Sequence, residues 1–111
     1  PEFSAVHHPG LVTHPDHELA TRLFQGYGGM GGLVLEGGTA ATHRFLSHLR
    51  LVTHAPSLAG VESLVSEPRL TSHKALGAEE RAALGIPDGF LRLSCGCEDT
   101  DDLLADLAGA L

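Results

Sequence analysis

Alternating apolar and polar positions predict a β-strand over residues 89–95. Its two faces consist of Leu91, Leu93 and Cys95 on one side, and of Phe90, Arg92 and Ser94 on the other. A guanidinium is always charged, and its planar fork suits a carboxylate, so Arg92 is a candidate anion-binding residue. The chain is acidic, so an ion pair between Arg92 and one of its own Asp or Glu residues is the alternative.

Apolar periodicity and turn residues divide the rest of the chain into helices and short strands. We expect strands at 3–8, 33–35, 51–53 and 61–65, and helices at 15–25, after 39, at 78–84 and after 99. This order lacks a strict strand–helix–strand rhythm. The layer rule therefore predicts an α+β fold, with a small mixed or antiparallel sheet covered by helices on one face.

Three of the expected helices carry apolar stripes that should face the core. The stripes are Leu19, Leu23 and Phe24 in the first helix, Ala41, Phe45, Leu46 and Leu49 in the second, and Leu103, Leu104, Leu107 and Leu111 in the last. Thr39 is the expected N-cap of the second helix. Acidic residues at the start of the last helix, among them Asp99, suit the positive end of a helix dipole.

Composition restricts the classes of function. The 111 residues suffice for one domain, and a net charge of −7 argues against nucleic acid and anionic membranes as partners. No apolar run approaches the length of a membrane span. Cys95 and Cys97 have neither a redox nor a zinc spacing, so we expect free, partly buried thiols in a reducing compartment and a cytoplasmic protein.

Eight histidines raise the alternative of a metal-binding protein. Those that lie close in sequence are His7 with His8, His14 with His17, and His43 with His48. Zinc needs three or four convergent ligands, and this spacing shows no convergence. We therefore expect no metal site.

Short segments along nearly the whole chain form a specific series. They are Val6–Leu11, His14–Ala20, Gly28–Met30, Ala55–Leu64, Thr71–His73, Glu79–Ile86, Asp88–Ser94, Glu98–Asp99 and Asp101–Leu107. In this order and at these distances, the series closely resembles the C-terminal end of the pyridoxal-phosphate enzymes of cysteine and methionine metabolism. That family includes cystathionine γ-synthase, cystathionine γ-lyase and methionine γ-lyase.

The resemblance implies that residues 1–111 form the small C-terminal domain of a fold-type I pyridoxal-phosphate enzyme, and that the large cofactor-binding domain is absent from this chain. Lys74, the only lysine, lies between matching segments and so not at the family's Schiff-base position. We therefore expect no catalytic or cofactor-binding residue here, and no activity from this chain alone. The implied partners are an amino-acid substrate, the missing N-terminal domain and further copies in a homo-oligomer.

Three positions match substrate-binding residues of the family. Arg92 matches the arginine that grips the α-carboxylate of the substrate. Ser57 matches the serine of the motif Ser-Leu-Gly-Gly-x-Glu-Ser, and Ser72 falls where relatives often carry a Thr that supports the same carboxylate. Turn and cap chemistry is the alternative role for both serines.

Two departures from the family pattern leave the substrate open. Pro56 stands where relatives often carry Glu, Val or Tyr, and Ala59 replaces the first Gly of the motif's usual pair. The resemblance thus implies a C–S lyase or γ-replacement enzyme of sulfur amino-acid metabolism without indicating which substrate it uses. A non-catalytic or embedded C–S lyase module of a larger biosynthetic protein is the alternative.

Overall fold

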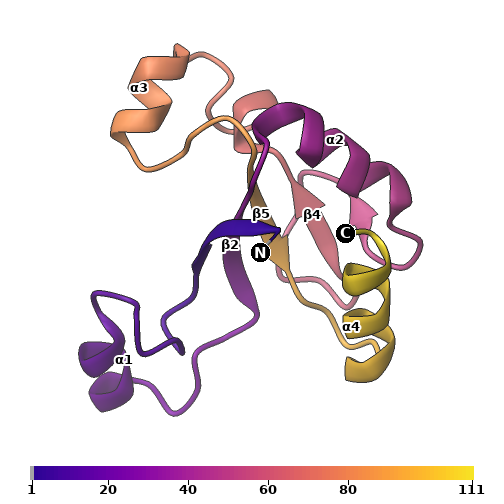
Figure 1. Cartoon of the computed structure of the whole chain (residues 1–111). Helices are drawn as coiled ribbons and strands as arrows, with labels where there is room; N and C mark the ends of the chain where they lie inside the picture. The colour runs from indigo at the N-terminus through magenta and orange to yellow at the C-terminus, as the bar shows by residue number, and fades with distance from the viewer. Residues whose placement is uncertain (1) are drawn as a thin grey trace.

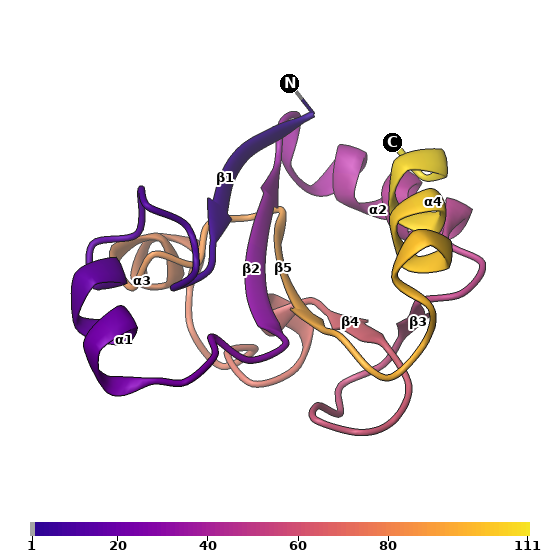
Figure 2. The same ribbon diagram turned by 90° about the horizontal axis from the view of Figure 1, so that it is seen from below.

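Five strands form one mixed sheet, in the order β1-β2-β5-β4-β3, in the computed structural model, which describes residues 2–111. The strands are β1 Phe3–His7, β2 Met30–Leu35, β3 Thr53–His54, β4 Leu64–Ser66 and β5 Phe90–Ser94. Neighbouring strands are antiparallel except β3 and β4, which are parallel. The predicted α+β fold with a mixed sheet is confirmed, and the strand that carries Arg92 is the central one (Figure 2).

The helices divide into two pairs around this sheet. They are α1 His17–Leu23, α2 Gly38–His48, α3 Ala78–Ala83 and α4 Thr100–Gly109, with a short 3₁₀ turn, η1, at Pro68–Leu70. Helices α2 and α4 lie side by side over one face of the sheet (Figure 1). Helices α1 and α3 project on the other side, so the face opposite α2 and α4 has no helix packed across its centre.

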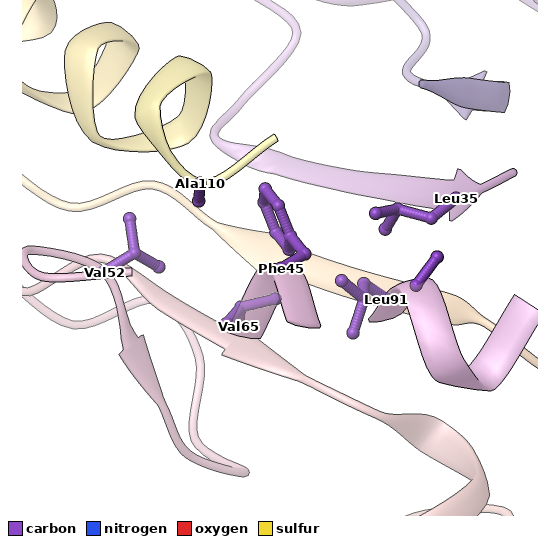
Figure 3. Close-up of a cluster of buried hydrophobic side chains, with 7 residues drawn as sticks. Leu35, Phe45, Val52, Val65, Leu91 and Ala110 are labelled. Atoms are coloured by element: carbon purple, nitrogen blue, oxygen red, sulfur yellow. The ribbon is translucent and has the colours of Figure 1, made fainter. Parts of the chain in front are cut away.

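The hydrophobic core lies between the sheet and the pair α2 and α4 (Figure 3). Its buried members are Leu35, Ala41, Phe45, Val52, Val65, Leu91 and Ala110. Phe45 is 2% exposed and receives the edge of the Phe3 ring at a centroid distance of 6.2 Å. The expected inward stripe of α2 is therefore confirmed, with Leu46 and Leu49 at the margin of the core.

Two predicted apolar stripes were partly wrong. Leu19, Leu23 and Phe24 are 45%, 67% and 57% exposed, because α1 projects from the sheet and buries only Ala20. The ring of His17 stacks on Tyr27 instead, with centroids 5.8 Å apart. In α4, Leu103 and Leu107 pack against the core as predicted, whereas Leu104 and Leu111 are exposed.

The strands expected at 51–53 and 61–65 begin later than predicted, at Thr53 and Leu64. In the first case the cause is the carboxylate of Asp106 in α4. It accepts the backbone N–H groups of Arg50, Leu51 and Val52 at 2.8, 3.0 and 2.9 Å, so these residues bond to a helix rather than to a strand. Burial raises the pKa of Asp106, but these three donors and the charge of Arg50 together lower it below its ordinary value.

The predicted cap of α2 was also wrong. Gly37 is the N-cap, with a φ of 88° that favours glycine, and Thr39 lies one residue inside the helix. By contrast, Asp99 caps α4 with its side chain, which accepts the N–H groups of Asp101 and Asp102. No helix within residues 2–111 is both long and apolar enough to cross a bilayer.

Candidate functional site

Arg92 lies on the face of the sheet that α2 and α4 leave open. Its neighbour Leu91 is fully buried in the core, and successive strand residues point to opposite faces. Directly beside Arg92 stand Gly32 of β2 and Ser66 of β4, and His7 of β1 pairs with Gly32 in turn. The two residues next to Arg92 are small, and the Phe90 ring lies over Gly32, where a Cβ would come within 2.6 Å of its Cζ.

A shallow pocket of about 310 Å³ lies on this face of the sheet. Arg92, Phe90, His7, Gly32, Ser72 and His73 belong to its lining. The ring of His7 stacks on that of Phe90 with centroids 6.0 Å apart, and the hydroxyl of Ser72 is 2.8 Å from Nδ1 of His73. The pocket therefore combines an aromatic wall with the guanidinium of Arg92 and several hydrogen-bonding side chains.

The guanidinium of Arg92 is held by backbone carbonyls rather than by an acid. Its Nη2 donates to the carbonyl oxygens of Pro56 and Ser57 at 2.9 and 3.1 Å. The ion pairs within residues 2–111 involve other cations, so the alternative of an internal pair with Arg92 does not apply there. Nε of Arg92 is buried and has no hydrogen-bond partner among the described residues, which is unusual for so strong a donor.

The structure brings the three predicted site residues together in different ways. Arg92 and Ser72 line the same pocket, and Ser57 reaches Arg92 through its carbonyl oxygen. The side chain of Ser57 itself is exposed. Sequence analysis missed the contributions of His7 and His73, because strand register and loop course, rather than local pattern, place them in the pocket.

The segment 56–63, which carries Ser57, is attached to β5 and to the residues that follow it. The N–H of Ala59 donates to Oγ of Ser94 at 2.9 Å. Glu98 accepts the N–H of Ser63 at 2.6 Å and its hydroxyl at 2.7 Å. These bonds from Ser63, the hydroxyl foremost, lower the pKa of Glu98 below its ordinary value.

Two of the histidines, His43 and His54, contact the same carboxylate, which their spacing in the sequence did not indicate. His43 and His54 lie on either side of the buried carboxylate of Glu67, at 3.6 and 3.8 Å, while Nε of Arg69 bonds to it at 3.0 Å. Across residues 2–111, no three His, Cys, Asp or Glu side chains are placed to hold a metal ion. Cys95 and Cys97 are free and exposed, whereas the sequence suggested partly buried thiols.

Comparison with known proteins identifies the family. A sequence profile described as Cys/Met metabolism PLP-dependent enzyme matches residues 1–111. Cystathionine gamma-lyase of Dictyostelium discoideum is 46% identical over 100% of this chain and 29% of its own length, and L-methionine gamma-lyase of Pseudomonas putida is 43% identical over 100% and 28%. The chain therefore belongs to the family of PLP-dependent enzymes of cysteine and methionine metabolism.

The fold agrees with that of solved members. The crystal structure of cystathionine gamma synthase from Xanthomonas oryzae pv. oryzae in complex with cystathionine has a TM-score of 0.91 and 50% identity to this chain. The match covers 98% of this chain and 28% of that one. The chain thus spans less than a third of the length of these relatives.

Enzymes of this family depend on pyridoxal phosphate, which is bound covalently by a lysine and needs an anion site for its phosphate. The residues of this chain do not fit that requirement by themselves. Lys74, the only lysine, is exposed on the segment between η1 and α3 and is not part of the pocket around Arg92. The pocket on the open face contains the cation Arg92 and no lysine.

Proposed function

We propose that this chain supplies the substrate-carboxylate side of the active site in a PLP-dependent enzyme of sulfur amino-acid metabolism. Arg92 binds the α-carboxylate, with Ser57 and Ser72 beside it. The reaction class is C–S cleavage or γ-replacement, as in the relatives named above. The observation that carries the proposal is a guanidinium on the open face that has no acidic partner among the described residues.

Electrostatics support an anionic ligand at this position. A half-buried arginine keeps its charge at any physiological pH, and taking that charge out of water is unfavourable unless an anion or several acceptors compensate. Two carbonyl oxygens compensate through Nη2 alone. A carboxylate that entered the pocket would add the opposite charge and accept donors of the same planar group.

The carbonyl contacts also orient the guanidinium. Nη2 bonds to Pro56 and Ser57 at once, so rotation of the planar group is restricted before any ligand arrives. An oriented fork that binds a carboxylate fixes the rest of the amino acid in one position, which is an entropic contribution to the reaction rate. In this proposal the chain binds and positions the substrate, and the chemical steps belong to groups outside residues 1–111.

The remaining parts of the proposal follow from the assignment of substrate binding to this chain and of the chemical steps to groups outside it. A cofactor-binding domain N-terminal to this one would complete the enzyme, and residues 1–111 would act as a single small domain without activity of their own. Assembly into a homo-oligomer and a location in the cytoplasm belong to the same proposal. The two free, exposed cysteines are consistent with a reducing compartment.

The test compares a carboxylate ligand with its uncharged carboxamide. In the full-length protein that contains this chain, loaded with pyridoxal phosphate, dissociation constants are measured for L-methionine and L-methioninamide from the visible absorption of the cofactor. Wild-type protein should prefer L-methionine. Arg92→Ala should weaken the binding of L-methionine by about 10- to 100-fold, as expected for the loss of a charge-assisted pair. It should leave the binding of L-methioninamide nearly unchanged.

Arg81→Ala is a matched control. Arg81 is also half-buried, and its guanidinium pairs with Asp88 at 2.8 Å outside the pocket. Its loss should lower stability without changing the preference for L-methionine. An unchanged preference in Arg92→Ala, whether both affinities stay the same or both fall equally, would refute the assignment of Arg92 to the carboxylate.

A further inference from the structure

Alternate residues along β5 and its continuation contact the segment 56–63 one after another. Arg92 donates to the carbonyls of Pro56 and Ser57, and Ser94 accepts the N–H of Ala59. Gly96 follows, and then Glu98 binds Ser63. Within β5, Arg92 and Ser94 share one face and hold the start of the segment, and Glu98, beyond the end of the strand, holds its last residue.

Gly96 lets the two chain segments approach most closely. A Cβ at this position would collide with the carbonyl of Val61 and with the carbonyl carbon of Glu62. The N–H of Cys97 donates to the same Val61 carbonyl at 2.8 Å, and the N–H of Gly96 donates to the hydroxyl of Ser63 at 2.8 Å. The end of the loop nearest Ser63 is therefore firmly attached, and the end nearest Ser57 has fewer bonds.

Ala59 is the weak point of the attached loop. It has a φ of 59° and is the only residue other than glycine within 2–111 with a positive φ. The left-handed conformation is unfavourable for any residue with a Cβ, so an interaction outside Ala59 must compensate for it. The bond from its N–H to the hydroxyl of Ser94, which is 2% exposed, is the contact that does so.

We propose that Ser94 is a positioning residue for the carboxylate site, acting through Ala59. Its hydroxyl holds Ala59 in the left-handed conformation. That conformation places the carbonyls of Pro56 and Ser57 against Nη2 of Arg92, and these carbonyls set the orientation of the guanidinium. The inference rests on the proposed function for the meaning of an oriented Arg92, but its structural part can be tested alone.

The position of Ser94 supports this coupling. It lies on the same face of β5 as Arg92, two residues further along, so both side chains reach the same loop from one rigid, central strand. Ser94 is 2% exposed, so its hydroxyl is held within the structure at the N–H of Ala59. Removing the hydroxyl would leave that N–H without its acceptor, while the strand that carries Arg92 keeps its pairing.

The first measurement is amide hydrogen exchange at Ala59 in the full-length protein. Ser94→Ala should raise the exchange rate of this amide by about 5- to 30-fold, the range expected for a lost bond to a buried acceptor. In the double variant Ser94→Ala with Ala59→Gly this amide still lacks its acceptor and should exchange as fast as in Ser94→Ala, so recovery of the left-handed conformation by glycine is read from ligand affinity instead. Unchanged exchange in Ser94→Ala would overturn the proposal.

The second measurement is the affinity for L-methionine and L-methioninamide, as used for Arg92. Ser94→Ala should weaken the binding of L-methionine by about 5- to 10-fold and that of L-methioninamide by less. In the double variant, Ala59→Gly should restore the preference for L-methionine. A purely structural role would lower affinity for both ligands equally, and that result would refute the positioning role. A loss that Ala59→Gly leaves unchanged would show that Ser94 does not act through Ala59.

Ser4→Ala serves as the control. Ser4 is also a strand serine, and its hydroxyl makes one bond to the carbonyl of Val34, far from the loop in the order of the sheet. It should change neither exchange at Ala59 nor ligand preference. If Arg92→Ala does not alter the preference for L-methionine over L-methioninamide, the proposed function is refuted. If Arg92→Ala alters this preference and Ser94→Ala does not, only the present inference is refuted.

Discussion

The two faces of the central sheet are built from the same strands but differ in nearly every physical respect. The face under α2 and α4 consists of large apolar side chains; Leu91 on it is 0% exposed and shares the core with Phe45 of α2, which is 2% exposed. The opposite face carries a charge at Arg92 between small residues, Gly32 and Ser66. One face therefore stabilises the fold, and the other carries the charge to which the proposed function assigns a ligand.

The contrast shows how a small domain separates stability from binding. The stabilisation from the hydrophobic effect is roughly proportional to the apolar area that is buried, and it does not depend on the orientation of the groups. The face under α2 and α4 therefore tolerates substitutions that keep volume and patterning. An ion-binding face depends on direction, because a displaced donor loses its hydrogen bond. We expect substitutions on the first face to change unfolding and those on the second to change affinity.

The largest expected effect tests the helical face. Phe45→Ala removes a fully buried ring from the centre of the core and should lower the free energy of unfolding by about 3–5 kcal/mol. Leu104→Ala, at a helical position that is 59% exposed, should cost less than about 0.5 kcal/mol. Urea unfolding curves of both variants measure these free energies of unfolding. Similar losses of stability in the two variants would contradict the assignment of the core.

An intermediate effect is expected on the open face. A Cβ at Gly32 would lie 2.6 Å from Cζ of Phe90, so Gly32→Ala should push this ring into the pocket. We expect destabilisation by about 1–3 kcal/mol together with weaker binding of L-methionine. Gly31→Ala is the control on the same strand, because its Cβ would meet only the carbonyl of His7 at 3.6 Å. Equal effects of the two substitutions would show that the two faces are not distinguished at this point.

The smallest effect concerns acid stability on the helical side. The pKa of Asp106 is lowered in the folded chain, so its stabilisation is complete above its ordinary pKa of about 3.9 and is lost as the pH falls toward the folded value. Asp106→Asn should cost about 1 kcal/mol at neutral pH, allowing for partial exposure, and should flatten the loss of stability below about pH 4. Urea midpoints between pH 3 and 7 would show this, and an unchanged acid slope would assign it to other carboxyl groups.

Sequence patterns predicted the elements whose signals are local. The alternation around Arg92 identified β5 and its two faces, and the spacing of Ala41 and Phe45 identified the inward side of α2. The predicted strand boundaries were wrong where a side chain distant in sequence binds the backbone N–H groups. The strand expected from residue 51 starts at Thr53 because Asp106, more than fifty positions away, binds the preceding N–H groups.

The candidate site divides in the same manner. Residue type indicates Arg92 as a candidate site residue, and the resemblance to the family adds Ser57 and Ser72. Nothing local could have placed His7 beside Phe90, or joined Ala59 to Ser94 across 35 positions. Those contacts depend on strand register and on the course of a loop without regular structure.

The sequence by itself determined the class of fold, the central strand with its charged and apolar faces, and the residues that mark the family. Only the tertiary structure decided that backbone carbonyls rather than an acid hold Arg92, and that α1 leaves its leucines exposed. The physical reason is range. Periodicity and turn chemistry act over a few residues, whereas strand register and hydrogen bonds to side chains join groups that the chain keeps far apart.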